Sequence, residues 1–469
     1  MDEGLLINIT FHGAARTVTG SRHLLDINGY RILLDCGLFQ GHRAETYERN
    51  LHFAFNPKDI QTAIISHAHM DHLGNIPNLV KQGFQGDIHC TSATFDLANI
   101  MLMDAASIQE GDIDFVNKIR RKHNEPKVEP LYRVEDVAPA LKLFSGYSYD
   151  HFFNIADNVK VAFRDAGHIL GSAITILFMK DGDRETSICF TGDLGRYNMP
   201  IIRDPFVVDD ADILIIESTY GNRLHTDIKN VQDRLAKVIN ETVSRGGNLI
   251  VPSFALERTQ ELIYNLHQLK LSHRIPDIPV FVDSPLAIDA TDIFRIHPEC
   301  YDAETAELLR TVPDPFGFRG LRYVSTVEES KSLNELKTPV MLIAGSGMAE
   351  AGRILHHLKH NIGNPRNTVL IVGWQAENTL GRKIAEKWPE VSIFGEKYKL
   401  RCRVEIFNEF SAHADRNDLI KWASAGKARW QKVFVVHGEE SAALSLAEAF
   451  SEAGLSNVIV PQYGQSFTL

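Results

Sequence analysis

Two patterns of apolar and polar residues divide the chain. In its first part, apolar and polar positions alternate over residues 6–11, 23–27 and 30–34, which predicts short β-strands. Asn28 and Gly29 separate the last two runs, and an Asn-Gly pair is typical of a tight hairpin turn. Residues 94–143 are instead helical in pattern and charged, and Pro126 and Pro130 are expected to break the helix.

From about residue 221 the pattern changes to helices that alternate with short buried strands. Helices are predicted over residues 230–244, 255–269 and 350–359, and strands over residues 248–252, 280–282, 339–344 and 368–372. This alternation is typical of a parallel sheet covered by helices. Because 469 residues exceed what one hydrophobic core usually serves, two domains are expected. We predict a first domain over residues 1–220, an inserted domain over 221–396, and a return to the first domain over 397–469.

The composition is that of an ordinary soluble globular protein, with 44% hydrophobic and 23% charged residues. No apolar stretch is long enough to cross a bilayer, and the Met-Asp-Glu-Gly start lacks the basic segment of an export signal. We therefore expect a cytoplasmic protein without membrane contact. Its five cysteines are far apart and form no Cys-x-x-Cys pair, so reduced thiols are expected. Cys36 and Cys189 are expected to be core residues rather than metal ligands.

A net charge of −11 argues against a surface built for nonspecific binding of nucleic acid, which relies on Lys and Arg. A groove can still be locally positive, especially where divalent metals supply the charge. Residues 118–122 and 397–403 are candidate basic patches, although each is more typical of a solvated face.

Residues 67–72 carry the strongest chemical signal. They read His-Ala-His-Met-Asp-His and directly follow the apolar run 62–66. Imidazole and carboxylate suit zinc and similar ions, and an open coordination position generates hydroxide near neutral pH. His168, Asp193 and His437 also follow short apolar runs. Each alone is most often a turn residue beside glycine, but together with the His cluster they predict a two-metal site at strand ends.

With Asp35, in Leu-Leu-Asp-Cys-Gly, these residues resemble the metallo-β-lactamase superfamily. Glu217, in Ile-Ile-Glu-Ser-Thr-Tyr-Gly, His413, in Phe-Ser-Ala-His-Ala-Asp, and His437 resemble the additional motifs of the β-CASP nucleases. That family includes the endonuclease subunit of the eukaryotic pre-mRNA 3′-end cleavage machinery and its bacterial and archaeal relatives. The resemblance implies an α/β fold, a metallo-β-lactamase αββα sandwich with an inserted β-CASP α/β cap domain.

The resemblance also implies a metal-dependent ribonuclease that hydrolyses phosphodiester bonds of single-stranded RNA, as an endonuclease, a 5′-to-3′ exonuclease or both. His437 favours RNA, because the DNA-repair branch of the family typically has valine at this position. Two alternatives stay open. A small-molecule hydrolase shares the His cluster but does not need an inserted domain or the Glu217 and His413 pair. A noncatalytic RNA-binding scaffold would have lost metal ligands, whereas this set is whole. Because the family often dimerises, a homodimer is also considered.

Residue roles follow from the same resemblance. Two Zn²⁺ ions per chain are expected, with Mn²⁺ as a substitute, and a bridging hydroxide attacks the scissile phosphorus. His413 is the candidate general acid, with Glu217 favouring its protonated form, and Asp35 fixes a ligating imidazole. The competing view of Glu217 and His413 is a buried ion pair without a catalytic task. The metal ligands implied are His67, His69 and His168 for one ion, Asp71, His72 and His437 for the other, and Asp193 as the bridge.

The inserted block carries candidate phosphate contacts. Gly345, Ser346 and Gly347 lie between a predicted strand and a predicted helix, where backbone N–H groups could cradle an anion. Ser253 is placed as a helix N-cap, and Arg258 follows about one turn later. Such turns and caps are also normal structural devices, but the family's similar Gly-Ser-Gly and Pro-Ser-Phe segments favour a role in binding phosphate.

Overall fold

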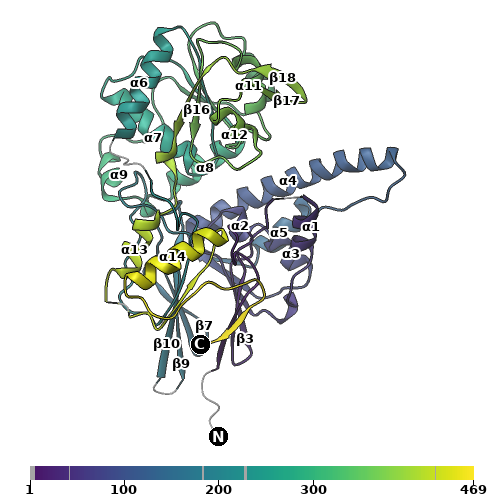
Figure 1. Ribbon diagram of the computed structural model, residues 1–469, viewed down its shortest axis with the longest axis vertical. Coiled ribbons are helices and arrows are strands. Elements are labelled where there is room, and N and C mark those ends of the chain that lie inside the picture. Colours follow the sequence, from purple (N-terminus) through teal and green to yellow (C-terminus); the bar gives the residue numbers. More distant parts are fainter. Residues whose placement is uncertain (1–5, 42, 182–183, 226–229, 428) are drawn as a thin grey trace. The chain divides into compact units, whose positions relative to one another are not determined.

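The computed structural model describes residues 6–41, 43–181, 184–225, 230–427 and 429–469 (Figure 1). The expectation about the first four residues therefore lies outside the described part. The chain forms two compact units, a first unit of Met1–Leu224 with His413–Leu469 and a second unit of His225–Ala412. The boundary predicted at residue 397 is too early, because β19 (Arg403–Phe407) pairs along its whole length with β16 (Thr368–Val372) of the second unit.

The first unit contains two seven-stranded sheets. In the first sheet, β1 (Ile7–Phe11) and β2 (His23–Ile27) bury every second residue, so one face of each strand points into the core. The turn between β2 and β3 has positive φ at Asn28 (49°) and Gly29 (89°), as the predicted hairpin requires. The strands, in sheet order, are β22 (Ser466–Thr468), β1 (Ile7–Phe11), β2 (His23–Ile27), β3 (Tyr30–Leu34), β4 (Thr62–Ile64), β5 (Asp87–Thr91) and β6 (Phe144–Tyr147).

The second sheet of this unit packs against the first through buried side chains of both, such as Phe11, Leu25, Phe163 and Leu177. Three of its strands are parallel neighbours, so their carboxyl ends lie at the same sheet edge: β10 (Arg184–Phe190), β11 (Ile213–Ile216) and β20 (Lys432–Val435). In sheet order the strands are β21 (Val458–Ile459), β20 (Lys432–Val435), β11 (Ile213–Ile216), β10 (Arg184–Phe190), β9 (Ala173–Asp181), β8 (Val159–Asp165) and β7 (Phe152–Ala156).

Helices flank both sheets of the first unit, which gives the αββα sandwich expected from the motifs (Figure 1). The helical segment predicted over residues 94–143 forms two helices, and residues 123–133, which contain the two prolines, separate them. The helices are α1 (Arg43–Leu51), α2 (Met70–Leu73), α3 (Ile76–Lys81), α4 (Ser92–Lys122) and α5 (Val134–Leu141), with α13 (Arg416–Ser424) and α14 (Glu440–Glu452) on the second sheet.

The second unit is built on a six-stranded parallel sheet whose central strands are completely buried. Burial on both faces explains why these strands read as continuous apolar runs in the sequence. The strands, in sheet order, are β14 (Leu321–Tyr323), β13 (Val280–Asp283), β15 (Met341–Ala344), β12 (Leu249–Pro252), β16 and β19. A hairpin of β17 (Glu390–Ile393) and β18 (Glu396–Lys399) stands apart from this sheet.

The helices of the second unit confirm the predicted alternation, with later starts at two places. The helix predicted from residue 255 begins at Arg258, because Glu257 before it has a φ of 66°. Ser253 is therefore not its N-cap, and the helix predicted from residue 350 begins at Ile354. The helices are α6 (Val231–Ser244), α7 (Arg258–Leu271), α8 (Pro285–Ile296), α9 (Ala303–Leu308), α10 (Val327–Leu333), α11 (Ile354–Asn361) and α12 (Leu380–Ala385). Short 3₁₀ turns occupy Pro57–Asp59 in the first unit and Pro298–Cys300 and Asn408–Phe410 in the second.

Within the described residues, no helix combines the length and the apolar character that crossing a bilayer would require.

Candidate metal centre

The candidate ligands converge because parallel strands end at the same sheet edges. Asp35 directly follows β3, and the segment with His67 and His69 follows β4, its parallel neighbour. In the second sheet, Asp193 follows β10 and His437 follows β20. The ends of parallel strands are where open α/β sheets usually place functional side chains.

His413 lies beside the same sheet edge, but it belongs to the segment before α13 and not to the end of a strand. The backbone N–H of Ala414 donates to the carbonyl of Leu194 at 2.8 Å, and an isolated β-bridge joins His413 to Gly195. These contacts hold His413 beside the turn that carries Asp193. The following helix α13 begins at a fixed point, because the Asp415 side chain caps it.

A first group of ligand atoms comprises the side chains of His67, His69, His168 and Asp193. Nδ1 of His69 lies 3.1 Å from Nε2 of His67 and 3.2 Å from Nε2 of His168. Oδ2 of Asp193 lies 3.5 Å from Nε2 of His67 and 3.6 Å from Nε2 of His168. Four potential ligand atoms therefore surround one point.

A second group lies directly beside the first. Nε2 of His72 and Nε2 of His437 are 3.1 Å apart, and Oδ2 of Asp71 lies 3.5 Å from Nε2 of His437. Oδ1 of Asp193 lies 3.3 Å from Nε2 of His72. Because its other oxygen faces the first group, the Asp193 carboxylate lies between the two groups.

The donor set fits divalent ions better than it fits a hydrogen-bond network. Nδ1 of His69 carries either one proton or one lone pair, so it cannot complement both nitrogens that face it at 3.1 and 3.2 Å. Ligands bound tetrahedrally at about 2.0–2.1 Å from zinc would be about 3.3 Å apart, which is close to these separations. Oδ1 of Asp193 is buried and has no partner of good hydrogen-bond geometry among the described residues. The residues present therefore fit a metal.

The protonation states of the first group agree with metal binding. Burial lowers the pKa of His67 and of His168 well below the ordinary histidine value, and it lowers the pKa of His69 to about 4. The three rings are therefore neutral near pH 7, the state in which imidazole coordinates a metal.

Asp35 orients one ring of the second group. Burial acts against protonation of His72, but Asp193 and Asp35 outweigh it and hold the pKa of His72 well above its usual value. Oδ2 of Asp35 lies 2.6 Å from Nδ1 of His72, and its Oδ1 accepts a hydrogen bond from the backbone of Ser66 at 2.8 Å. Asp35 thus engages Nδ1 and leaves Nε2 directed at the centre.

Glu217 and His413 form a pair at the edge of this centre. Nδ1 of His413 lies 3.2 Å from both carboxylate oxygens of Glu217, which is fully buried. The backbone N–H groups of Leu194 and Thr219 also donate to this carboxylate, at 2.7 and 3.2 Å. Burial opposes protonation of His413, but Glu217 and then Asp193 outweigh it and raise the pKa of His413 to about 9. A half-buried imidazolium therefore stands beside the ligand groups at neutral pH.

Two contacts of this centre were missed in the sequence. The hydroxyl of Thr219 lies 3.2 Å from Nδ1 of His437, and the hydroxyl of Ser66 lies 3.0 Å from Nδ1 of His67. Both fix the orientation of a ring, as supporting groups around metal ligands commonly do. Their only signal in the sequence is their position within a motif, one residue from His67 and two from Glu217.

Cys36 and Cys189 are core residues, as expected. Cys36 and Cys189 are fully buried, and all five cysteines of the chain are free. Burial raises the pKa of the Cys36 thiol to about 12, so it stays protonated at neutral pH. None of the described metal-type groupings contains a cysteine.

The five predicted phosphate contacts lie in the second unit, where their polar groups contact the protein itself. Ser253 Oγ lies 3.3 Å from the carbonyl of Phe254, and the Arg258 guanidinium donates to the carbonyl of Val372 at 3.3 Å. Ser346 Oγ accepts two backbone hydrogen bonds at 3.1 and 3.3 Å. The backbone N–H of Ile354, the first residue of α11, donates to the carbonyl of Gly345 at 3.1 Å. Phosphate binding by Ser253, Arg258, Gly345, Ser346 and Gly347 stays a prediction.

Comparisons with known proteins agree with this architecture. Family models match residues 19–238 (metallo-beta-lactamase superfamily), 259–384 (Beta-Casp domain) and 397–461 (Zn-dependent metallo-hydrolase RNA specificity domain). A solved protein of unknown function from Enterococcus faecalis V583 has a similar fold, with a TM-score of 0.57 at 13% identity over 99% of this chain and 100% of that one.

Curated relatives extend over nearly the whole chain. Ribonuclease TTHA0252 of Thermus thermophilus is 35% identical over 97% of this chain and 98% of its own. An RNase J-like protein of Methanocaldococcus jannaschii is 31% identical over 94% of this chain and 95% of its own. Transcription termination factor FttA of Methanosarcina mazei is 32% identical over 94% of this chain and 68% of its own. With these relatives and the three matching models, the chain belongs to the β-CASP ribonuclease family of the metallo-β-lactamase superfamily.

Proposed function

We propose that this protein is a metal-dependent ribonuclease that hydrolyses phosphodiester bonds of single-stranded RNA. The observation that carries the proposal is the pair of ligand groups that share Asp193, next to a protonated His413. The names of two relatives, a ribonuclease and an RNase J-like protein, point to the same polymer. A small-molecule hydrolase would leave the second unit and the Glu217–His413 pair without a task.

We propose two zinc ions per chain, with manganese as a substitute. One ion would be held by His67, His69 and His168, the other by Asp71, His72 and His437, and Asp193 would contact both. When bound, such ions supply Lewis acidity for the phosphoryl oxygens and a nucleophile near neutral pH. The support is the spacing of the ring nitrogens and the neutral state of the first three imidazoles.

The chain's own residues supply the proton. Glu217 accepts from Nδ1 of His413 and keeps the ring protonated, so the proton on Nε2 is the one given to the leaving oxygen. Asp35 acts through His72 and is a positioning residue, since it contacts the ring nitrogen on the far side from the centre. A general acid of this kind contributes about 10²–10⁴-fold to the rate.

The proposal is tested with an end-labelled single-stranded RNA beside the same sequence as DNA. RNA loss with the metal-loaded protein that vanishes in His69→Ala supports a metal-dependent ribonuclease, and the product ladder separates internal cuts from trimming of an end. Intact RNA despite two bound metals per chain would contradict it. A cytoplasmic location belongs to the same proposal, and five free cysteines accord with a reducing compartment.

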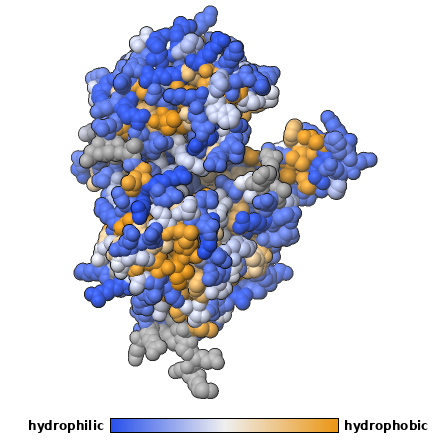
Figure 2. Space-filling model, in the orientation of Figure 1, coloured by the Kyte–Doolittle hydropathy of each residue, from blue (hydrophilic) through white to orange (hydrophobic). Residues whose placement is uncertain are grey.

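We also propose that the protein forms a homodimer through α4. Ile108, Phe115 and Ile119 of this helix are 57%, 65% and 44% exposed. At 3.6 residues per turn they lie within about 40° of one another, so they form one apolar stripe. Figure 2 shows apolar side chains gathered on this helix ahead of its hydrophilic end.

Charge favours a second copy of the chain on this stripe. Along α4, Asp112 precedes Phe115 and Lys118 follows it, so an antiparallel copy would set the acidic part of one helix against the basic part of the other. Phe115→Glu should give a monomer by light scattering, with unchanged metal content. A wild type that is monomeric at the concentrations used in the assay would contradict the dimer.

A further inference from the structure

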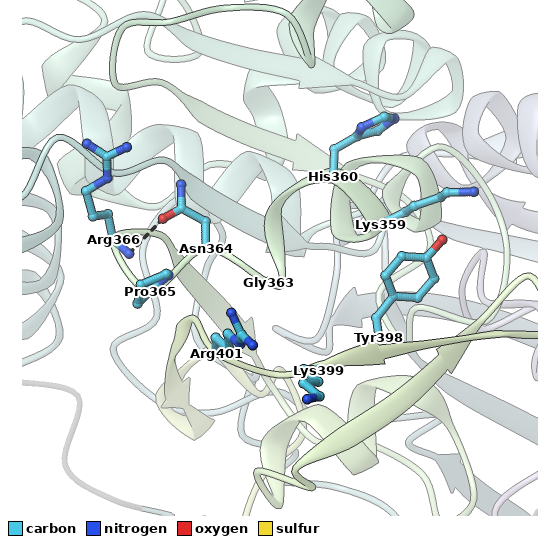
Figure 3. A pocket seen from close by; sticks show the side chains of 9 residues that line it. All are labelled: Lys359, His360, Gly363, Asn364, Pro365, Arg366, Tyr398, Lys399 and Arg401. Atoms are coloured by element: carbon cyan, nitrogen blue, oxygen red, sulfur yellow. Dashed lines mark hydrogen bonds between the residues drawn. The ribbon is translucent and has the colours of Figure 1, made fainter.

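The second unit carries a hollow of about 480 Å³ with a basic lining (Figure 3). The end of α11, the turn before β16 and the end of β18 with the loop after it form its walls. Figure 3 shows its two arginines on one side and an aromatic ring with a lysine and a histidine on the other. The residues that matter are Lys359, His360, Arg366, Tyr398, Lys399 and Arg401.

Most of this positive charge is not neutralised inside the protein. Lys359 pairs with Glu396 at 3.2 Å and so adds little net charge. Arg366, Lys399 and Arg401 are exposed, and no ion pair joins any of them to a carboxylate in the described part of the chain. The chain has 60 acidic residues against 49 basic ones, so acidic partners are abundant elsewhere. Three clustered cations without such a partner leave a local positive potential that attracts anions.

The shape and the chemistry of the hollow fit a single-stranded nucleic acid. Tyr398 offers an aromatic face beside the cations, and Phe394 at the turn of the β17–β18 hairpin is 52% exposed. Single-strand binding surfaces combine cations that follow the backbone with aromatic rings on which bases stack. A solvated basic face would need neither the concave shape nor an aromatic ring in its lining.

We propose that this hollow binds the phosphate backbone of single-stranded RNA and that it is a substrate-binding site separate from the metal ligands. The inference rests on the proposed ribonuclease function and extends it to the way in which the protein binds long RNA substrates. Tyr398, Lys399 and Arg401 belong to the basic segment 397–403 and to the part of the chain that matches the RNA specificity domain. On this proposal, long RNA contacts the hollow as well as the metal ligands, whereas cleavage of a trinucleotide does not depend on the hollow.

The test compares two triple variants, each of which removes the charges of two arginines and one lysine. Arg366→Gln, Lys399→Gln and Arg401→Gln change the hollow. Arg319→Gln, Arg322→Gln and Lys337→Gln change two arginines and a lysine that are also exposed in the second unit but do not line it. Binding of a long phosphorothioate RNA to each metal-loaded protein is followed by fluorescence anisotropy over a series of KCl concentrations. Cleavage of long RNA and of a trinucleotide is measured in parallel.

The hollow variant should bind long RNA more weakly, and its slope of log affinity against log salt should flatten by about 2, since each lost single-strand phosphate contact removes about 0.7. It should cleave long RNA more slowly and the trinucleotide at the wild-type rate. If the two triple variants bind and cleave long RNA equally well, the proposal that the hollow is a binding site is overturned. Competition by a polyglutamate peptide as strong as that by RNA would overturn its assignment to RNA. The two proposals can fail separately. If the wild type cleaves no RNA, and the hollow variant alone loses RNA binding, the ribonuclease proposal fails whereas the proposed binding site is supported.

Discussion

The two units each bury a cluster of charged and polar side chains, but the clusters are built in opposite ways. In the second unit, Asp283 is fully buried and each side chain that contacts its carboxylate can donate a hydrogen bond. Its Oδ1 accepts from Arg353 at 2.6 Å, and its Oδ2 accepts from Ser330 at 2.5 Å and lies 2.7 Å from Nε2 of His357. Nδ1 of the same histidine faces Asn334 at 3.0 Å.

In the first unit, the imidazoles of the metal centre face one another instead. His69 has two ring nitrogens of other residues within 3.2 Å, and His72 faces His437 at 3.1 Å. Nδ1 of His69 cannot complement both nitrogens that face it, so a bound ion would satisfy this group, whereas each side chain that contacts Asp283 can donate a hydrogen bond. Complementary partners therefore indicate a structural cluster, and convergent ligand atoms without complementary partners indicate a binding site.

The largest effect is expected from removing a metal ligand. His69→Ala or prolonged chelation should lower RNA cleavage by more than about 10³-fold, because a single lost electrostatic donor already costs about 10²–10³. Metal content by mass spectrometry should fall with activity, while the circular dichroism spectrum should keep its native form. A His69→Ala protein that retains both metals and full activity would contradict the view that the cluster around His69 is a metal site and the Asp283 cluster a structural one.

A smaller loss is expected from the proton donor. His413→Asn and Glu217→Gln should each reduce cleavage by about 10²–10⁴-fold, since they remove a general acid or the group that keeps it protonated. Metal content should not change in either variant. Undiminished cleavage would mean that this pair is a buried ion pair without a catalytic task, and hence of the same kind as the Asp283 cluster.

The Asp283 cluster should affect stability and leave chemistry intact. Asp283→Asn should lower the free energy of unfolding of the second unit by about 3 kcal/mol, because it leaves Arg353 and His357 without their anion. Urea unfolding measures this change, and the exposed Asp289→Asn serves as a control expected to stay within about 0.5 kcal/mol. A loss of bound metal in Asp283→Asn would contradict the assignment of separate roles.

At acid pH, the difference in stability between the wild type and Asp283→Asn should become smaller. Burial acts to raise the pKa of Asp283, but hydrogen bonds from His357, Ser330 and Arg353 outweigh it, so the folded pKa lies below its ordinary value. The stabilisation is therefore complete above the unfolded pKa of about 3.9 and is lost as the pH falls through the folded pKa. The gap in urea midpoint between wild type and Asp283→Asn should be wide at neutral pH and should narrow in acid. A gap that is the same at both pH values would show that the carboxylate charge is not what stabilises the cluster.

Local patterns explain which features could be predicted. Strands 23–27 and 30–34 and the strand 368–372 were predicted at their observed bounds, because alternation and continuous apolar runs report burial directly. The His cluster was readable because four of its ligands lie within six residues. The start of α7 could not be predicted from the sequence. This helix begins later than predicted because Glu257 has left-handed backbone geometry, which its residue type does not indicate.

The sequence by itself therefore determined the family, the candidate ligands and the elements that deliver them, because each depends on neighbours along the chain. Tertiary structure alone decided which groups meet. It brings His72 against His437 across 365 positions, turns the two oxygens of Asp193 toward different groups, and places β19 in the sheet of the second unit. It also pairs Lys359 with Glu396 while Arg366 and Arg401 face solvent. Contacts between distant segments depend on strand order and register, and neither is encoded in the spacing of residues along one strand.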